Sequence, residues 1–306
     1  MFHHLHDETH PPGGQGSISG DTFEEALNFI GTENILGPDE WISRLKNNRL
    51  RRDDVCITFD DALRCQYDIC APILKRLNLR CFWFVYSSVF EDQPDKLEIY
   101  RFFRVRHFDA IDDFYGLFFL KIQEGSFKKI NENRFKKYLH EASITFPFYS
   151  FNDLKFRFLR DEVLQKGEYE ELMDAIIEER AIDIKDISRD LWLTAAQLKD
   201  LSSDGHAVGL HSYSHPTVLA NLSYSAQMDE YKKNLIHIKK ICNREVLAMS
   251  HPCNSYNDAT SRILKKLGII CGFRSNMVPP KGKRINPSFL EIAREDHSNI
   301  VRQVSK

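Results

Sequence analysis

Two adjacent carboxylates follow an apolar run near residue 60. Val55–Ile57 leads through Thr58 and Phe59 into Asp60 and Asp61, as though a short strand ended on a pair of acids. Two neighbouring carboxylates are costly to keep ionised unless a cation neutralises them. One of the pair could therefore hold a metal ion while the other stays free as a base. The acids could equally cap a helix that begins directly after them.

Two histidines follow a second apolar run. Val208–Leu210 leads into His211 and, four residues later, His215. Two histidines at this spacing can turn their imidazoles toward one metal ion. A single histidine is more often a packed side chain bonded to the backbone, but two strand-end histidines together with strand-end acids favour a mononuclear metal site of the two histidines and one of the two carboxylates. Such a donor set leaves coordination positions open, as catalytic metals require.

The elements that would position these residues are short apolar runs alternating with helical patterns. This alternation is typical of βα units and a mostly parallel sheet or barrel, in which the carboxyl ends of the strands share one face. We expect an α/β fold of barrel type. The seven predicted strands are Met1–His4, Val55–Phe59, Cys81–Val85, Ala207–His211, Val246–Ser250, Ile269–Phe273 and Phe289–Ala293.

The alternation fails in the middle of the chain. Charged and aromatic residues run together over residues 91–190, and 13 of the 22 phenylalanines lie between Phe102 and Phe158. We expect a helical insertion here that shapes or covers the site, with residues 1–90 and 191–306 forming the barrel. The phenylalanines could line a sugar- or lipid-binding groove, but aromatics at helical spacing more often form the core of a small subdomain.

Composition excludes several classes of function. The net charge of -2 shows no basic excess, so a nucleic-acid partner is not expected. The seven cysteines are odd in number and contain no CxxC pair, which favours reduced thiols. The start of the chain turns polar at once, and no apolar run reaches 18 residues, so we expect a cytoplasmic protein without a transmembrane segment.

The two acid and histidine motifs resemble those of a known family. TFDD at residues 58–61 and HSYSH at residues 211–215 are similar to the first two motifs of the polysaccharide deacetylases, carbohydrate esterase family 4. The likeness covers roughly residues 1–90 and 190–275. It implies a distorted (β/α)7-type barrel with a helical insertion, and metal-assisted removal of acetyl groups from sugars. By the same resemblance Asp60 is the base, and Asp61, His211 and His215 hold one divalent metal ion, zinc being the first choice.

The family's third motif is matched only in part. Pro252 stands in place, and the Cys253 N–H is a candidate donor to the oxyanion. Ser250 occupies the position where the family has an arginine. Arg294, near the last predicted strand, is a candidate replacement for that arginine.

The family's last motif supplies a histidine that acts as general acid. His297 is the only late histidine, so the resemblance assigns it this role although the leucine of the motif is missing. The chain also begins with a dense group of histidines. His4 in that group is a candidate for substrate contact or for an alternative proton donor, and its neighbours could equally be solvent-exposed.

The function implied is removal of an N-acetyl group from an amino sugar in a glycan or glycan precursor, with surface polysaccharide biosynthesis as the setting. The expected partner is an acetylated amino-sugar substrate. Two alternatives stay open at this point. One is a metal amidohydrolase acting on another C–N bond, and the other is a carbohydrate-binding pseudoenzyme that has lost turnover.

Overall fold

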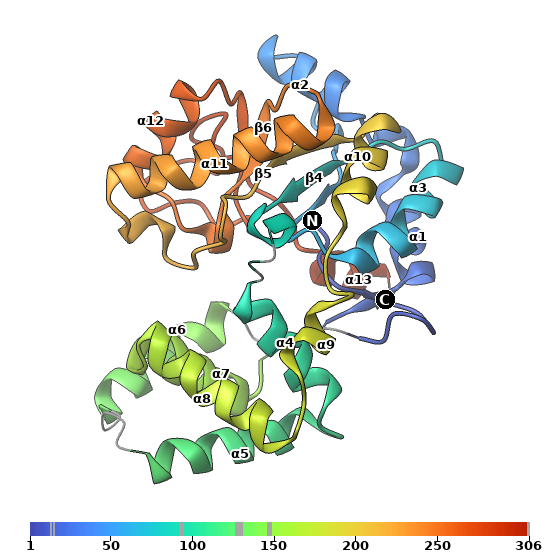
Figure 1. Cartoon of the computed structure of the whole chain (residues 1–306). Coiled ribbons are helices and arrows are strands. Elements are labelled where there is room, and N and C mark those ends of the chain that lie inside the picture. The colour runs from blue at the N-terminus through green and yellow to red at the C-terminus, as the bar shows by residue number, and fades with distance from the viewer. Residues whose placement is uncertain are drawn as a thin grey trace. The chain divides into compact units, whose positions relative to one another are not determined.

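The structure is a computed structural model and describes residues 1–12, 14, 16–91, 93, 95–125, 131–145 and 149–304, with the backbone alone at 144 and 145. The chain divides into two compact units (Figure 1). The first combines Met1–Asp95 with Asp190–Lys306, and the second is Lys96–Arg189. Each unit is described by itself below.

The first unit is built on a curled, fully parallel sheet. Its five strands lie in chain order, and they are β3 (Thr58–Phe59), β4 (Phe82–Val85), β5 (Ala207–Leu210), β6 (Ala248–Ser250) and β7 (Cys271–Phe273). Parallel bridges extend the sheet at both edges, from Phe59 to Phe2 and from Phe273 to Ile292. The α/β fold of barrel type expected from the sequence is confirmed.

The two edge segments also meet each other. The backbone nitrogen of Met1 donates to the Glu295 carbonyl at 2.7 Å. The His297 N–H donates to the Met1 carbonyl at 3.1 Å. Seven segments therefore follow one another around the ring, joined at the last step by these two hydrogen bonds.

Several strands are shorter than predicted, as Val55–Phe59 is reduced to β3, and two predicted edge strands contribute only single bridges. Met1–His4 contributes one bridge, because the chain then turns into β1 (Leu5–His6), which pairs with β2 (Ile18–Ser19) in a separate small sheet. Phe289–Ala293 also contributes one bridge. Its backbone meets Gly272 from both Phe289 and Ile292, but a turn closed by Glu291 N–H to the Ser288 carbonyl interrupts the ladder.

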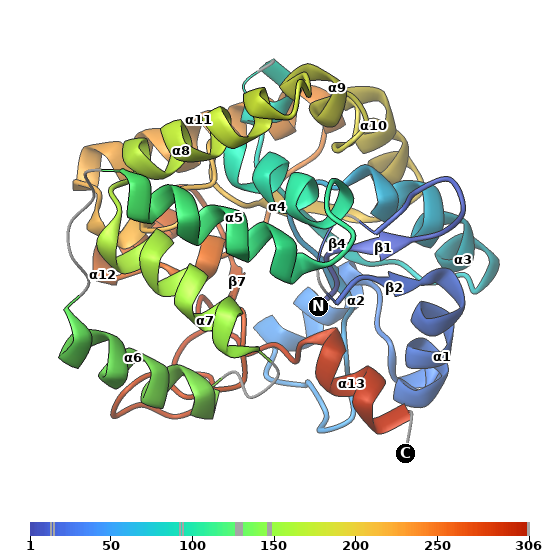
Figure 2. The same ribbon diagram turned by 90° about the horizontal axis from the view of Figure 1, so that it is seen from below.

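Helices cover the outside of the sheet (Figures 1 and 2). They are α1 (Gly20–Ile30), α2 (Pro38–Lys46), α3 (Ala71–Arg76), α10 (Ala195–Ser203), α11 (Tyr224–Cys242), α12 (Asp258–Lys266) and α13 (His297–Val304). Helix α11 packs against β5 and against both α10 and α12. Thr194 and Gln197 form a reciprocal capping box at the start of α10, the helix that precedes β5 in the chain.

Strands β4 and β5 pack closely in the core at Gly209, two residues before His211. Phe59 stacks on Trp83 with ring centroids 4.3 Å apart, and Phe84 is fully buried. Gly209 lies against Phe84, and a Cβ at this position would come within 2.6 Å of that ring. Only glycine allows this approach, so packing fixes the path of the chain that enters His211.

The second unit is helical. Its helices are α4 (Lys96–Arg106), α5 (Ile111–Glu124), α6 (Glu132–Thr145), α7 (Phe151–Phe158), α8 (Lys166–Glu179) and α9 (Ile184–Ser188). Phe114, Phe118 and Phe156 are buried and pack edge-to-face in its core. Phe127, Phe146 and Phe148 lie outside the described residues. That this unit shapes or covers the site stays a prediction.

Two further findings concern the described residues as a whole. None of their helices is both long enough and apolar enough to cross a bilayer. No disulfide joins their seven cysteines.

Candidate active site

The predicted acids and histidines lie where their strands end. Asp60 and Asp61 follow β3, and His211 follows β5, so all three stand at the carboxyl edge of the sheet. The backbone leaves the pleat there: Asp61 has a φ of 75° and His215 a φ of 54°. Left-handed conformations are unfavourable for residues with a Cβ, and they occur most often at functional sites that the surrounding structure holds in place.

Asp61, His211 and His215 form one buried cluster. The Asp61 Oδ1 lies 3.3 Å from the His211 Nε2 and 3.4 Å from the His215 Nε2. The His211 Nδ1 lies 2.9 Å from the Ser250 carbonyl oxygen. A carbonyl only accepts hydrogen bonds, so Nδ1 carries the proton, and in neutral His211 the Nε2 lone pair faces the Asp61 carboxylate. Two acceptors face each other here, an arrangement that a cation between them would stabilise.

The spacing of this cluster fits a metal ion. Metal–ligand bonds of 2.0–2.2 Å at tetrahedral angles place neighbouring ligand atoms about 3.3–3.6 Å apart, and the observed separations are 3.3 and 3.4 Å. His215 is oriented as metal-binding histidines usually are, with its Nδ1 3.2 Å from the Asp95 carboxylate. Sequence reasoning missed Asp95, because nothing in its neighbourhood marks it as a partner of a residue 120 positions away.

Asp60 lies beside this cluster and is held by Arg294. The guanidinium forms a two-pronged ion pair, with NH1 to Oδ1 at 2.7 Å and NH2 to Oδ2 at 2.6 Å. Burial raises the pKa of Asp60, but the positive charge of Arg294 and its hydrogen bonds to the carboxylate outweigh burial and hold that pKa well below its usual range. Asp60 is therefore a carboxylate at neutral pH, available to accept a proton.

Arg294 is buried at the position where the missing family arginine was sought. Its NH2 also donates to the Ser250 hydroxyl at 2.7 Å, and that hydroxyl donates to Asp60 Oδ2 at 3.0 Å. Ser250 is the residue that stands where the family has its arginine, and here it lies in contact with Arg294. The sequence predicts Arg294 as a replacement for the family's arginine at the oxyanion- and substrate-binding side of the site. In the structure its contacts are to Asp60 and to neighbouring backbone and hydroxyl groups.

A third histidine, His3, lies beside Asp60. Its Nε2 lies 3.8 Å from Asp60 Oδ2, and one of its ring nitrogens lies within 4.8 Å of ligand atoms of Asp296 and His297. Burial lowers the pKa of His3 to about 4, against the opposing charges of Asp61 and Asp60. Sequence reasoning named His4 from the same group and passed over His3.

His297 and His4 occupy different surroundings. The His297 Nε2 donates to the Gly16 carbonyl at 2.9 Å, and its ring stacks on Phe2. Within the described residues no hydrogen bond or ion pair joins His297 to Asp60, so the general-acid role of His297 stays a prediction. His4 is buried, with its ring against Gly14.

Pro252 and Cys253 follow β6 in a short 3-10 turn. Pro252 is buried, and Cys253 is exposed with a φ of 48°. The turn comes directly after Ser250, whose carbonyl orients His211. The use of the Cys253 N–H as an oxyanion donor stays a prediction.

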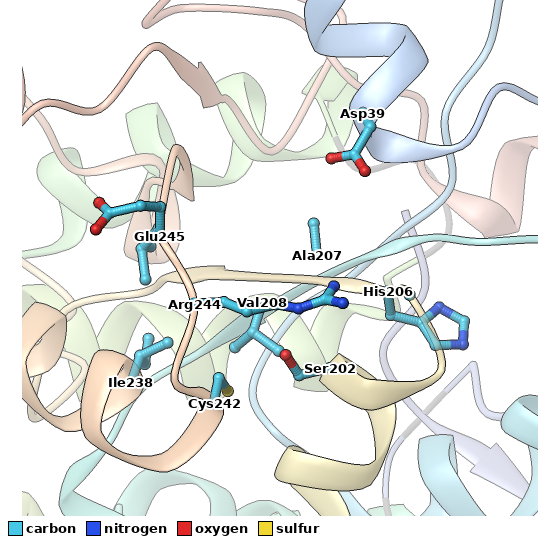
Figure 3. Close-up of a pocket in the computed structure, with 11 residues that line it drawn as sticks. Asp39, Ser202, His206, Ala207, Val208, Ile238, Cys242, Arg244 and Glu245 are labelled. Atoms are coloured by element: carbon cyan, nitrogen blue, oxygen red, sulfur yellow. The ribbon is translucent and has the colours of Figure 1, made fainter.

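A separate pocket lies at the other ends of the strands (Figure 3). It is lined by residues that begin or precede β5 and β6, among them His206, Ala207 and Val246. None of the predicted catalytic, metal-binding or substrate-binding residues lines it. This pocket is therefore not part of the predicted site.

Comparison with known proteins gives three findings. The sequence profile of the polysaccharide deacetylase family matches residues 173–271, a segment that contains both predicted metal-binding histidines. No protein of curated function is similar enough in sequence to match. Several solved structures share the fold at low sequence identity.

Three of these structures cover nearly the whole chain. The Streptococcus pyogenes deacetylase PplD in complex with acetate has a TM-score of 0.56 and 19% identity, covering 99% of this chain and 96% of its own. IcaB from Ammonifex degensii has a TM-score of 0.56 and 12% identity, with 99% and 93% covered. A de-N-acetylase from Aggregatibacter actinomycetemcomitans has a TM-score of 0.54 and 12% identity, with 99% and 97% covered. The resemblance to the polysaccharide deacetylase family is thus confirmed by sequence over residues 173–271, and these three structures share the fold over nearly the whole chain.

Proposed function

We propose that this protein is a metal-dependent deacetylase that removes the N-acetyl group of an amino sugar in a glycan or glycan precursor. The observation that carries the proposal is the pairing of two features. Three buried donors stand at metal-ligand spacing, and a separate buried carboxylate beside them is kept ionised by its own guanidinium. A site that only bound a metal would need the donors but not the second carboxylate.

Asp61, His211 and His215 would hold the metal. A bound divalent ion at such a site polarises a carbonyl and lowers the pKa of a coordinated water. Two imidazoles and a carboxylate suit zinc, which is our first choice, although several transition metals accept the same donors. The donors can hold their positions because the Ser250 carbonyl and Asp95 fix the two rings from behind.

Asp60 would act as the base. Because Arg294 keeps it ionised, Asp60 can accept the proton of an attacking water at neutral pH. Arg294 also fixes the plane of the carboxylate, since both oxygens are bound in the two-pronged pair. Arg294 is therefore a positioning residue for Asp60. It comes from the last segment of the ring, whereas the family has its arginine at the position of Ser250.

We infer that His3, and not His297, donates the proton to the departing amine. His3 is the histidine in contact with Asp60, whereas the contacts of His297 are to Gly16 and Phe2. Burial keeps His3 neutral in the free site, so His3 would first take up the proton that Asp60 accepts from the attacking water, across the 3.8 Å between them. It would then pass that proton to the nitrogen of the amine as the C–N bond breaks. The carboxylate of Asp296, close to His3, supports the same protonation.

The experiment is acetate release from a substrate panel. The panel contains N-acetylglucosamine oligomers, a nucleotide-linked N-acetylamino sugar, an O-acetylated sugar and a small amide without a sugar. Metal-dependent acetate from an N-acetylated sugar, lost in Asp60→Asn, supports the proposal. Hydrolysis of the small amide alone would identify an amidohydrolase of another class. No hydrolysis of any substrate by metal-loaded protein would favour a carbohydrate-binding protein without turnover.

A further inference from the structure

The helical unit contains a repeated arginine pattern that the proposed chemistry does not use. Arg101-Phe102-Phe103-Arg104 lies on α4, and Arg157-Phe158-Leu159-Arg160 spans the end of α7 and the π-helical turn after it. Residues three apart on a helix lie on one face. Each segment therefore presents two guanidinium groups to the same side.

Arg104 is a buried cation that has no anionic partner in the described part of the chain. Only 5% of it is exposed, and its guanidinium lies over the ring of Phe156 at 4.5 Å and near the ring of Phe114 at 5.7 Å. Among the residues that the structure describes, Arg104 has no hydrogen bond or ion pair, and its Nε is buried without a partner. Aromatic faces attract a guanidinium but accept none of its N–H groups in the way an anion does.

The second arginine segment and a tyrosine converge on the same rings. The Arg160 guanidinium lies 5.7 Å from the centre of Phe156, the ring that Arg104 covers. Tyr169 on α8 also packs against Phe156, is 5% exposed, and has a buried hydroxyl without a hydrogen-bond partner in the described residues. Burial, together with the charges of Arg160 and Arg157, lowers the pKa of Arg104 to about 10, and Tyr169 opposes this shift, so these groups are close in space.

The carboxylates nearby are already bound to other groups. Glu98 binds Arg101 at 2.6 Å, and Asp161 binds Arg160 at 2.6 Å. Asp153 accepts from the hydroxyls of Tyr115 and Ser150. An unpaired buried charge is strongly unfavourable. Among the residues that the structure describes, these acids therefore leave Arg104 and the Tyr169 hydroxyl available to a group from outside.

We propose that Arg104, Arg160 and Tyr169 form a binding site for an anion of the phosphate class. A phosphate group offers several oxygens on one small centre, which suits donors that approach from three different helical segments. Planar guanidinium forks match phosphate oxygens, and the ring of Phe156 fixes the planes of two of them. The cluster reaches solvent through the side chains of Arg101 and Arg160, which are 30% and 17% exposed.

The test is binding of phosphate to the full chain, measured by calorimetry and by thermal unfolding. The probes are inorganic phosphate and a nucleoside diphosphate sugar, each compared with sodium chloride at equal ionic strength. We expect either probe to raise the unfolding temperature of the wild type above the chloride control. Arg104→Met, which keeps the buried volume, should weaken binding at least about tenfold. The matched control is Arg189→Met, which removes an arginine of the same unit whose side chain is 71% exposed and should change nothing.

Tyr169→Phe serves as a second variant, because it removes one hydroxyl without changing the packing. It should weaken phosphate binding while the unfolding temperature in chloride stays close to that of the wild type. Tighter binding of the nucleoside diphosphate sugar than of phosphate would identify an organic phosphate as the ligand, and equal binding would identify the free ion. The proposal is overturned if neither probe binds the wild type, or if Tyr169→Phe binds them as the wild type does. The test does not measure acetate release, so its outcome is independent of the proposed deacetylase function.

Discussion

Replacing Arg294 with methionine should destabilise the protein strongly, because it leaves Asp60 as a buried carboxylate without its cation. Both side chains are only 4% exposed, so solvent cannot take the place of the lost partner. Removing one partner of such a pair costs about 3–5 kcal/mol. With an unfolding entropy of about 2.1 cal/mol/K per residue over the roughly 200 residues of the barrel unit, the melting temperature should fall by about 7–12 °C.

The pH dependence gives the sharper test. In the wild type Arg294 depresses the pKa of Asp60, so the stability from this carboxylate is fully present above the unfolded value of about 3.9 and is lost as pH falls through the folded value. Without Arg294, burial pushes the pKa of Asp60 upward. The variant should then lose less stability at acidic pH than at neutral pH, and the acidic limb of its kcat/KM profile should move to higher pH.

The assays are thermal unfolding and acetate release across pH 4–9 on metal-loaded protein. Arg284→Met, which removes an exposed arginine, is the control and should behave as the wild type. The double variant Ser250→Arg with Arg294→Met supplies a guanidinium from position 250 in place of position 294. It should recover part of the activity and return the acidic limb of the kcat/KM profile toward lower pH. An Arg294→Met variant with wild-type stability and an unchanged acidic limb would refute the reasoning.

Three further predictions concern the same site. Asp60→Asn should retain its metal and lose about 10²-fold or more in turnover, the scale of a positioned general base; near-normal acetate release would remove Asp60 from the mechanism. Asp95→Asn should weaken metal affinity by about 10–100-fold, because Asp95 orients His215 from behind; an unchanged dissociation constant in a metal-competition titration would contradict this. His3→Gln should lower kcat by about 10²-fold or more, whereas His297→Gln should lower it much less; the reverse order in steady-state kinetics would restore His297 as the donor.

The acid pair and the histidine pair could be located from sequence because each stands directly after a buried strand. Parallel strands place their carboxyl ends on one edge, so a local pattern at β3 and another at β5 predict a shared location. The structure brings Asp61, His211 and His215 within ligand distance of one another. The lengths of the strands were less predictable, because edge segments such as Phe2 and Ile292 pair through single bridges.

The partners of Asp60 could not be located with the same certainty. Arg294 lies 234 positions from Asp60, and it reaches Asp60 only because the last segment of the ring pairs with β7. Its sequence surroundings are those of an ordinary charged turn. The choice among the early histidines depends on register: the Asp60 N–H bonds to the Phe2 carbonyl, and this places the next residue, His3, beside the carboxylate. The sequence of this histidine-rich segment does not reveal that register.

The most direct test of the central claim is a metal titration of chelated protein, followed by acetate release from an N-acetylated amino-sugar substrate. Activity should rise in proportion to added metal, level off at about one equivalent per chain, and be absent at every metal concentration in Asp61→Ala. Full activity in the chelated wild type, or metal-dependent activity in Asp61→Ala equal to that of the wild type, would contradict a metal centre formed by Asp61, His211 and His215.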